Sequence, residues 1–175
     1  MRVVGPLGRG FALPAEGERA LLVGGGTGVA SLYQLAERSQ CAGRCSAIIV
    51  MLGARSGDDL MGRADFEALG VEVQIATEDG SLGRKGLVTE ILAEALAKDG
   101  PARVYACGPT PMMRACADLA ADAGKPCVVS LENNMACGFG VCLGCAAPRA
   151  EGGFSLVCRD GPVFDARDVA WEGLP

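Results

Sequence analysis

The sequence of 175 residues contains no histidine. Histidine is the commonest metal ligand in proteins, the usual acid–base group near neutral pH, and a ligand of Rieske-type clusters. Its absence excludes His-ligated zinc, Rieske centres and histidine-based catalysis. Aromatic residues are also scarce, at 5%, although 50% of the residues are hydrophobic. The core must therefore be built mainly from Val, Leu, Ile, Ala and Met.

The sequence also has no excess of positive charge and no long apolar run. The net charge of −5 argues against broad nucleic-acid binding, which requires a basic face. The longest apolar run, residues 47–52, is far shorter than the roughly 20 residues that span a bilayer. The first residues, MRVVGPLGRG, lack the apolar region of a secretory signal peptide. We therefore expect a cytoplasmic protein that binds neither nucleic acid nor a membrane.

Cysteine, by contrast, is abundant, with nine residues. Secreted disulfide frameworks use an even number of cysteines together with a secretory signal. Four of the nine follow the spacing Cys137-x4-Cys142-x2-Cys145-x12-Cys158. The first three match the plant-type ferredoxin run, and four thiolates complete the ligand set of a [2Fe–2S] cluster. We predict that these four cysteines hold such a cluster, so that the protein moves electrons one at a time.

Glycines accompany these cysteines at positions 138, 140 and 144. They allow the loop to adopt positive φ angles and to direct backbone N–H groups at the sulfur atoms. The alternatives are a structural zinc site with four thiolates, or plain buried cysteines. Zinc sites usually combine two CxxC pairs, and only one is present here. We interpret the remaining cysteine side chains as structural: Cys41, Cys45, Cys107, Cys116 and Cys127.

Short apolar strands alternate with helical patterns between residues 19 and 131. Strands are predicted at 20–23, 47–52, 71–76, 104–107 and 127–131, and helices at 28–38, 86–98 and 110–124. Thr110 is predicted as the N-cap of the last helix, with Pro111 as its first residue. The alternation predicts an α/β fold with a parallel five-stranded nucleotide-binding sheet and helices on both of its faces.

Composition divides the chain into three predicted parts. Residues 1–17 are rich in Gly and Pro and form an N-terminal segment without its own core. Residues 18–131 form the NAD-binding α/β domain. Residues 132–175 form a small C-terminal [2Fe–2S] domain with four cysteines and seven glycines. A module of this size cannot fold on a hydrophobic core alone, so we expect its metal centre to hold it together.

A glycine-rich turn, Gly24-Gly25-Gly26-Thr27-Gly28, joins the first predicted strand to the first helix. Glycines let the backbone approach a pyrophosphate, and a helix N-terminus favours its negative charge. The turn departs from the G-x-G-x-x-G pattern because Val29 occupies the last glycine position. We predict nucleotide binding here, and a tight turn without a ligand is the alternative.

Further candidates follow other strands, because open α/β sheets bind ligands at the carboxyl ends of their strands. The turn Cys107-Gly108-Pro109 follows the fourth predicted strand. Asp79 follows the third, and its carboxylate could bond a ribose or the nicotinamide amide. Arg55 follows the second, where the adenosine ribose would lie. An arginine there also suits a 2′-phosphate, so the sequence leaves NAD and NADP both open.

Together these motifs resemble the electron-transfer subunit of class B dihydroorotate dehydrogenase, within the ferredoxin-NADP reductase superfamily. The run SLENNMACGFGVCLGC is the most specific, because many reductases share the GGG and CGP turns. The motifs are GPLGRGF at 5–11, GGGTGVASL at 24–32, EDGSLGRKGLVT at 78–89, CGPTPMM at 107–113, SLENNMACGFGVCLGC at 130–145 and VCRDGPVF at 157–164.

The resemblance implies that NADH binds the α/β domain, with Gly25–Gly28 at the pyrophosphate and Cys107-Gly108-Pro109 near the nicotinamide. It implies a partner, the FMN-containing catalytic subunit, in a heterotetramer of pyrimidine biosynthesis whose electrons pass between FMN, [2Fe–2S], FAD and NAD. The family carries a flavin-binding β-barrel ahead of the GPLG segment, and the sequence begins at that boundary. FAD is therefore expected only if the barrel is supplied. The alternative is a non-catalytic iron–sulfur electron carrier, or a fragment that cannot turn over NADH alone.

Overall fold

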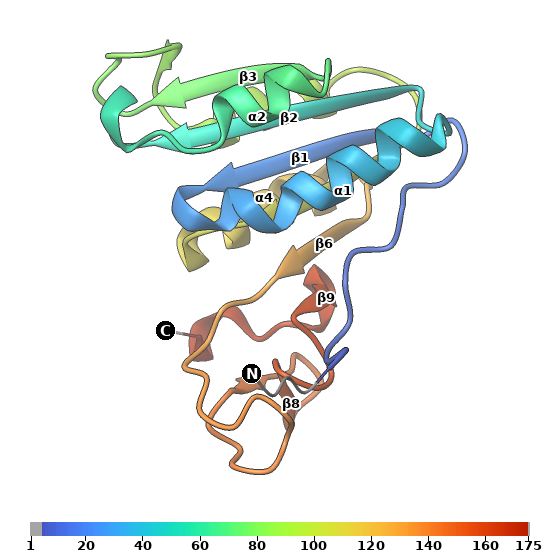
Figure 1. Cartoon of the computed structure of the whole chain (residues 1–175), viewed down its shortest axis with the longest axis vertical. Helices are drawn as coiled ribbons and strands as arrows, with labels where there is room; N and C mark the ends of the chain where they lie inside the picture. The colour runs from blue at the N-terminus through green and yellow to red at the C-terminus, as the bar shows by residue number, and fades with distance from the viewer. Residues whose placement is uncertain (1–4, 175) are drawn as a thin grey trace.

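A mostly parallel sheet forms the body of the protein in the computed structural model, which describes residues 5–174 (Figure 1). The predictions for residues 1–4 and 175 lie outside these described residues. The strands of the sheet are β1 (Arg19–Gly25), β2 (Ala47–Ala54), β3 (Glu72–Thr77), β4 (Arg84–Lys85), β5 (Ala102–Cys107), β6 (Cys127–Ser130) and β9 (Val163–Asp165). Their order is β4-β3-β2-β1-β5-β6-β9.

The helices and the remaining strands surround this sheet. The α-helices are α1 (Val29–Ala42), α2 (Arg63–Ala68), α3 (Val88–Leu96) and α4 (Thr110–Asp122). Short 3-10 helices are η1 (Gly26–Gly28), η2 (Gly57–Asp59), η3 (Ala166–Asp168) and η4 (Trp171–Gly173). The strands β7 (Ala146–Pro148) and β8 (Phe154–Leu156) form a separate hairpin. No helix within residues 5–174 is long and apolar enough to cross a membrane.

The predicted parallel five-stranded sheet is confirmed. β1 pairs in parallel with β2 and β5, and the parallel pairing continues outward to β3 and β6. The sheet gains an edge strand on each side, so its strand count is larger than predicted. On one side β4 adds two residues parallel to β3, and on the other β9 pairs antiparallel with β6. Segments this short carry no alternation from which the sequence could have predicted them.

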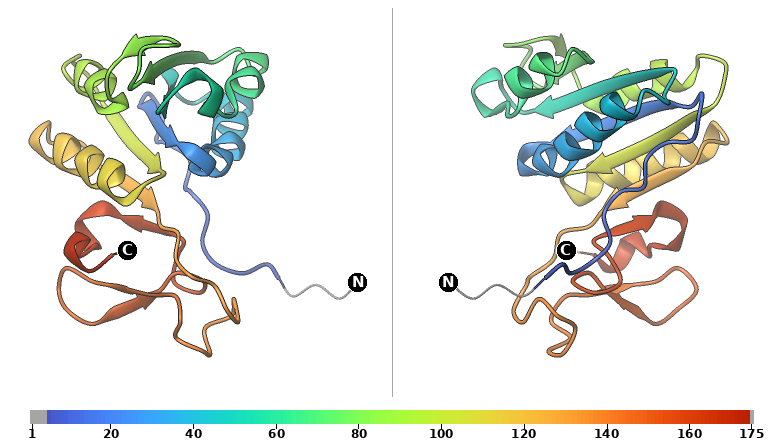
Figure 2. Two further views of the ribbon diagram at one scale, coloured as in Figure 1. Left: turned by 90° about the vertical axis from the view of Figure 1, so that its left-hand side faces the viewer. Right: turned by 45° about the vertical axis from the view of Figure 1, so that its right-hand side comes forward.

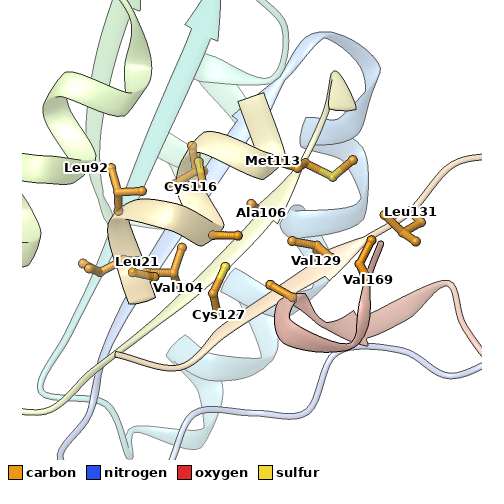
Figure 3. Packing of buried hydrophobic residues seen from close by; sticks show 14 of the residues in the cluster. Leu21, Leu92, Val104, Ala106, Met113, Cys116, Cys127, Val129, Leu131 and Val169 are labelled. Atoms are coloured by element: carbon orange, nitrogen blue, oxygen red, sulfur yellow. The ribbon is translucent and has the colours of Figure 1, made fainter. Parts of the chain in front are cut away.

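Helices on both faces of the sheet are confirmed as well. Because successive side chains of a strand point to opposite faces, β1 contributes to two separate cores. Ala20 and Leu22 join the core with α1 and α2, whereas Leu21 and Val23 join the core with α3 and α4. Figure 3 shows the second core, where Leu21 faces the helical residues Leu92 and Cys116.

Two helical details differ from the prediction. Helix α4 begins at Thr110 itself, with Pro109 as the N-cap. The backbone of Pro109 (φ −54°, ψ 138°) is not helical. Pro111 is then the second residue of the helix, where a proline is tolerated because the N–H groups of the first turn need no helical partner. Helix α2 was not predicted. It has six residues, of which only Phe66 is buried, so its sequence shows no helical period.

The segment that carries the cluster cysteines packs against the sheet. Cys145, Ala147, Leu156 and Val157 belong to the same core as α3 and α4. Figure 2 shows the N-terminal segment running from β1 along the molecule to this region. There the backbone N–H of Arg9 donates to Gly161.

Candidate nucleotide site and iron–sulfur centre

A cavity of about 580 Å³ lies where β1, β2, β3 and β5 end. Its wall includes the glycine-rich turn, the residues after β2 and the first turns of α3 and α4. The lining residues are Gly25, Gly26, Thr27, Gly53, Ala54, Arg55, Asp59, Met61, Ala76, Glu78, Gly86, Leu87, Val88, Thr89, Pro109, Pro111, Met112 and Ala115. The cavity therefore occupies the edge of the sheet where open α/β folds bind nucleotides.

The glycines of the turn serve two purposes. Gly26 has a φ of +54° and open space where a Cβ would stand, so it presents bare backbone to the cavity. Gly24 and Gly28 do not line the cavity. A Cβ on Gly28 would lie 2.4 Å from the carbonyl oxygen of Cys107, and one on Gly24 would lie 2.8 Å from Val29 Cγ1. These two glycines allow helix α1 to pack closely on the sheet.

The second predicted turn lies directly beside the first. Pro109 lines the cavity, and Gly108 (φ +155°) lets the turn approach Gly25, whose backbone N would be 3.0 Å from a Cβ there. The Cys107 thiol is buried beneath the turn, away from the cavity lining. Burial raises the pKa of this thiol, against hydrogen bonds with Ser31 and Ser130 that lower it.

Arg55 and Asp79 occupy different positions at the rim. Arg55 is exposed and lines the cavity. Asp79 does not line it, and its Oδ1 accepts hydrogen bonds from the backbone N (2.9 Å) and Oγ (2.7 Å) of Ser81. The hydrogen bond from the Ser81 hydroxyl, followed by the bond from the Ser81 backbone N, holds the pKa of Asp79 below its usual value. The Ser81 hydroxyl also accepts from Gly57 N at 2.8 Å, so Asp79 helps to join two rim loops.

Several cavity residues were missed by the sequence prediction. Glu78 directly precedes Asp79, and Asp59 lies four residues after Arg55, so the rule that strand ends carry sites could have found both. Met112 and Val88 come from the first turns of α4 and α3. Nothing local in the sequence indicates that these helix starts meet at one cavity.

The first two cluster cysteines form one pair in the loop of residues 137–145. The Cys137 sulfur accepts hydrogen bonds from the backbone N of Val141 (3.4 Å) and of Cys142 (3.5 Å). These N–H groups, with that of Phe139, lower the pKa of Cys137 to about 6, and the Cys142 thiol adds to the effect. Gly144 N donates in turn to the Cys142 sulfur at 3.4 Å. The loop therefore favours the thiolate that a metal requires.

Cys145 and Cys158 form the second pair, and both are buried. The backbone N of Cys158 donates to the Cys145 sulfur at 3.4 Å. A hydrogen bond with the Cys145 thiol, followed by burial, raises the pKa of Cys158, while the N–H of Gly140 acts in the opposite direction. Gly140 thus links the second pair to the loop that holds the first.

Two thiolate pairs fit a centre with two irons, each of which takes two ligands. The donor chemistry and the pairing therefore fit a [2Fe–2S] centre.

The backbone of the cluster loop is unusual. Gly138 (φ +77°) and Gly140 (φ +87°) adopt positive φ angles as predicted, whereas Gly144 does not. Leu143 has a φ of +60° and is the one non-glycine residue within 5–174 with a positive φ. Such a conformation costs free energy and persists only where the surroundings impose it. The loop is thus held in a shape that directs N–H groups at sulfur.

Comparison with known proteins extends this picture. Residues 22–118 match the family model of the oxidoreductase NAD-binding domain, and residues 132–170 match that of the iron–sulfur cluster binding domain of dihydroorotate dehydrogenase B. These two descriptions support an iron–sulfur cluster and NAD as cofactors of this chain.

Curated relatives match along nearly the whole chain. The dihydroorotate dehydrogenase B (NAD(+)) electron transfer subunit of Caldanaerobacter subterraneus subsp. tengcongensis is 44% identical over 172 residues, which is 97% of this chain and 66% of the relative. A probable subunit of the same name from Methanopyrus kandleri is 44% identical over 162 residues, with 93% and 59% covered. The chain thus spans about two thirds of the length of the first of these relatives.

Solved structures share the fold of this chain. The structure of an NADH-dependent reduced ferredoxin-NADP oxidoreductase, studied for flavin-based electron bifurcation, superposes with a TM-score of 0.86 at 34% identity, over 99% of this chain and 61% of that one. A ferredoxin reductase of carbazole 1,9a-dioxygenase, at 24% identity and a TM-score of 0.57, shares the fold. The chain therefore belongs to the dihydroorotate dehydrogenase B electron-transfer subunit family, among the oxidoreductases with this NAD-binding domain.

Proposed function

We propose that this protein relays electrons between NAD and the FMN-containing catalytic subunit of an NAD-linked dihydroorotate dehydrogenase, in pyrimidine biosynthesis. The observation that carries the proposal is the presence, on one chain, of two cysteine pairs and of a cavity at the carboxyl ends of the strands. The names of the relatives supply the dihydroorotate reaction and the role of a subunit. The cytoplasmic location stays a prediction from the sequence.

The cavity is the proposed NAD site. Gly25, Gly26 and Thr27 would hold the pyrophosphate at the glycine-rich turn, and Pro109 would face the nicotinamide. Gly24, Gly28, Cys107 and Gly108 would act indirectly, by packing the two turns together. The charged residues of the lining are Arg55, Asp59 and Glu78. Two carboxylates near one guanidinium suit a ribose hydroxyl and oppose a 2′-phosphate, so the charges favour NAD over NADP.

The four cysteines are the proposed ligands of the cluster, which supplies one-electron chemistry when bound. The N–H groups of Val141, Cys142, Gly144 and Cys158 reach sulfur atoms and would stabilise the negative charge of the ligand set. A nicotinamide exchanges a hydride, whereas a [2Fe–2S] cluster exchanges single electrons. FAD, which handles both, therefore belongs to the proposed set of cofactors.

The cluster loop also offers a surface for the partner subunit. Met135, Phe139, Val141 and Leu143 are 52%, 53%, 70% and 63% exposed, and we call this group the apolar collar. Exposed apolar side chains gathered at one place mark interaction surfaces. A partner that covers the collar would lie next to the cluster ligands, as direct electron transfer requires. The heterotetramer itself stays a prediction.

The test is to purify the protein without oxygen and to assay iron, sulfide, flavin and zinc on one sample. We expect about two irons and two sulfides per chain, as a [2Fe–2S] centre requires. Mixing with an FMN-containing dihydroorotate dehydrogenase subunit and FAD should then give dihydroorotate-dependent reduction of NAD⁺. A colourless sample with one zinc per chain would refute the proposal. A cluster that never exchanges electrons with NADH, even with FAD and the partner, would favour the carrier module.

The collar can be tested with a matched pair of variants. Val141→Ser should weaken binding of the catalytic subunit, measured by calorimetry, while the cluster spectrum stays intact. Phe154→Ser is the control, because Phe154 is 71% exposed but lies on β8 outside the cluster loop. Equal binding by both variants would show that the collar is not the docking surface.

A further inference from the structure

Arg159 directly follows the cluster ligand Cys158, and its side chain lies across the cluster loop. Gly140 has a φ of +87°, and a Cβ built there would lie 3.1 Å from Arg159 Cδ and 3.5 Å from Arg159 Cβ. The aliphatic part of the arginine therefore packs on the backbone of Gly140, which lies in the loop between Cys137 and Cys142. Arg159 thus contacts both segments that carry the ligands.

The guanidinium group is held in place by Asp160. Its Nε lies 3.0 Å from Oδ1 and its Nη2 3.3 Å from Oδ2, which is a two-point contact. Asp160 Oδ2 accepts a further hydrogen bond from the backbone N of Leu156 at 2.8 Å. The ion pair is therefore anchored to strand β8 and does not move freely in solvent.

The charge of Arg159 acts on the ligand set. Arg159 directly follows Cys158 in the chain and packs on Gly140 of the cluster loop, so its positive charge stands beside the proposed ligands. Reduction adds one negative charge to a [2Fe–2S] centre, so a nearby positive charge favours the reduced form and a nearby negative charge opposes it. Arg159 and Asp160 must then act with opposite signs.

We propose that the Arg159–Asp160 ion pair sets the reduction potential of the cluster, an inference that rests on the proposed [2Fe–2S] site. Arg159 is a positioning residue that raises the potential and secures the loop through Gly140. Asp160 lowers the potential and fixes the guanidinium. The protein can thus adjust its potential by changing either residue without touching a ligand.

The test is a redox titration of the reconstituted full chain, followed by electron paramagnetic resonance, for Arg159→Gln, Asp160→Asn and Arg159→Lys. At a given potential, Arg159→Gln should lower the ratio of reduced to oxidised cluster about threefold, the scale of partly exposed charges. This equals about 28 mV, since tenfold is about 59 mV for one electron. Asp160→Asn should raise the ratio by a similar factor, and Arg159→Lys should stay close to the wild type.

Arg167→Gln is the matched control. Arg167 makes the same kind of two-point contact, with Asp165, at 3.0 and 2.7 Å. Its replacement removes the same charge from the same part of the chain and should leave the potential unchanged. If Arg159→Gln loses its cluster, the rise with Asp160→Asn still tests the proposal, because asparagine retains an acceptor for Leu156.

The outcomes are distinguishable. A wild-type chain that holds no [2Fe–2S] cluster would overturn both the proposed function and this inference. A wild-type cluster whose potential is unchanged in Arg159→Gln and in Asp160→Asn would overturn the inference alone. A shift of the same sign in both variants would also overturn it, because a merely structural effect gives no opposition of sign.

Discussion

Gly26 offers a sharp test of the nucleotide site, because a side chain there meets no steric obstacle. Its φ is +54°, and no heavy atom lies within 4 Å of the position that a Cβ would take. A non-glycine residue in the left-handed region costs about 1–2 kcal/mol. We therefore expect Gly26→Glu to lose about that much free energy of unfolding and still to fold, since domains have about 5–15 kcal/mol available.

The effect on binding should exceed this strain. Gly26 lines the cavity, so the new carboxylate would face the two negative charges of the pyrophosphate. At about 5 Å and the dielectric constant of water, each pair of like charges costs about 0.8 kcal/mol. The two charges together cost about 1.7 kcal/mol, which weakens NADH binding more than tenfold. The bulk of the side chain increases the loss.

The assay combines urea unfolding with calorimetric titration by NADH. Gly43→Glu is the control, because Gly43 has a φ of +61°, equally open space and a position outside the cavity lining. Both variants carry the same strain and the same added charge, so both should lose similar stability. Only Gly26→Glu should lose NADH affinity. Equal NADH affinity in the two variants would refute the placement of the pyrophosphate.

Three further variants test other parts of the structure. Cys142→Ser should abolish the cluster absorption and make residues 132–174 sensitive to protease, because metal-binding free energy is also folding free energy; an intact spectrum would disprove the ligand assignment. Tyr105→Phe should raise the free energy of unfolding in urea by about 1 kcal/mol, because the buried Tyr105 hydroxyl has no hydrogen-bond partner among residues 5–174. Burial also raises the pKa of Tyr105 above its unfolded value, so the free energy of unfolding does not depend on this group below about pH 10 and falls as the pH rises further, because the phenol ionises first in the unfolded chain; the variant should flatten this alkaline loss. Gly28→Ala should cost about 1–3 kcal/mol in the same urea assay, because its Cβ would lie 2.4 Å from the carbonyl oxygen of Cys107, and an unchanged midpoint would show that α1 can shift.

The fold could be predicted from the sequence wherever burial alone decides the pattern. The run at 47–52 is apolar throughout because β2 is buried on both faces between β1 and β3. Helix α2 and strand β9 escaped prediction because their formation depends on contacts outside the segment. Phe66 is the only buried residue of α2, and β9 exists because the chain returns to pair with β6.

Site residues could likewise be predicted where the local sequence alone indicates them, and not where contacts between distant segments decide their role. The glycine-rich turn and the four cysteines could be found because their spacing alone reflects the chemistry. Met112 and Arg159 could not be found in this way, since their roles depend on which segments fold against one another. Asp79 shows the converse case. Its position after a strand suggests a contact with the cofactor, which stays a prediction, and the structure adds that its Oδ1 accepts two hydrogen bonds from Ser81.

The two sites are joined by packed structure. Met112 lines the cavity, and the next residue, Met113, belongs to the core that also contains Cys145 and Cys158. Strand β6 ends at Ser130, directly before the segment of the cluster loop, and β9 pairs with β6 shortly after Cys158. The position of the cavity relative to the cluster cysteines is therefore set by one continuous core and one strand ladder within this chain, and a partner subunit does not need to create it.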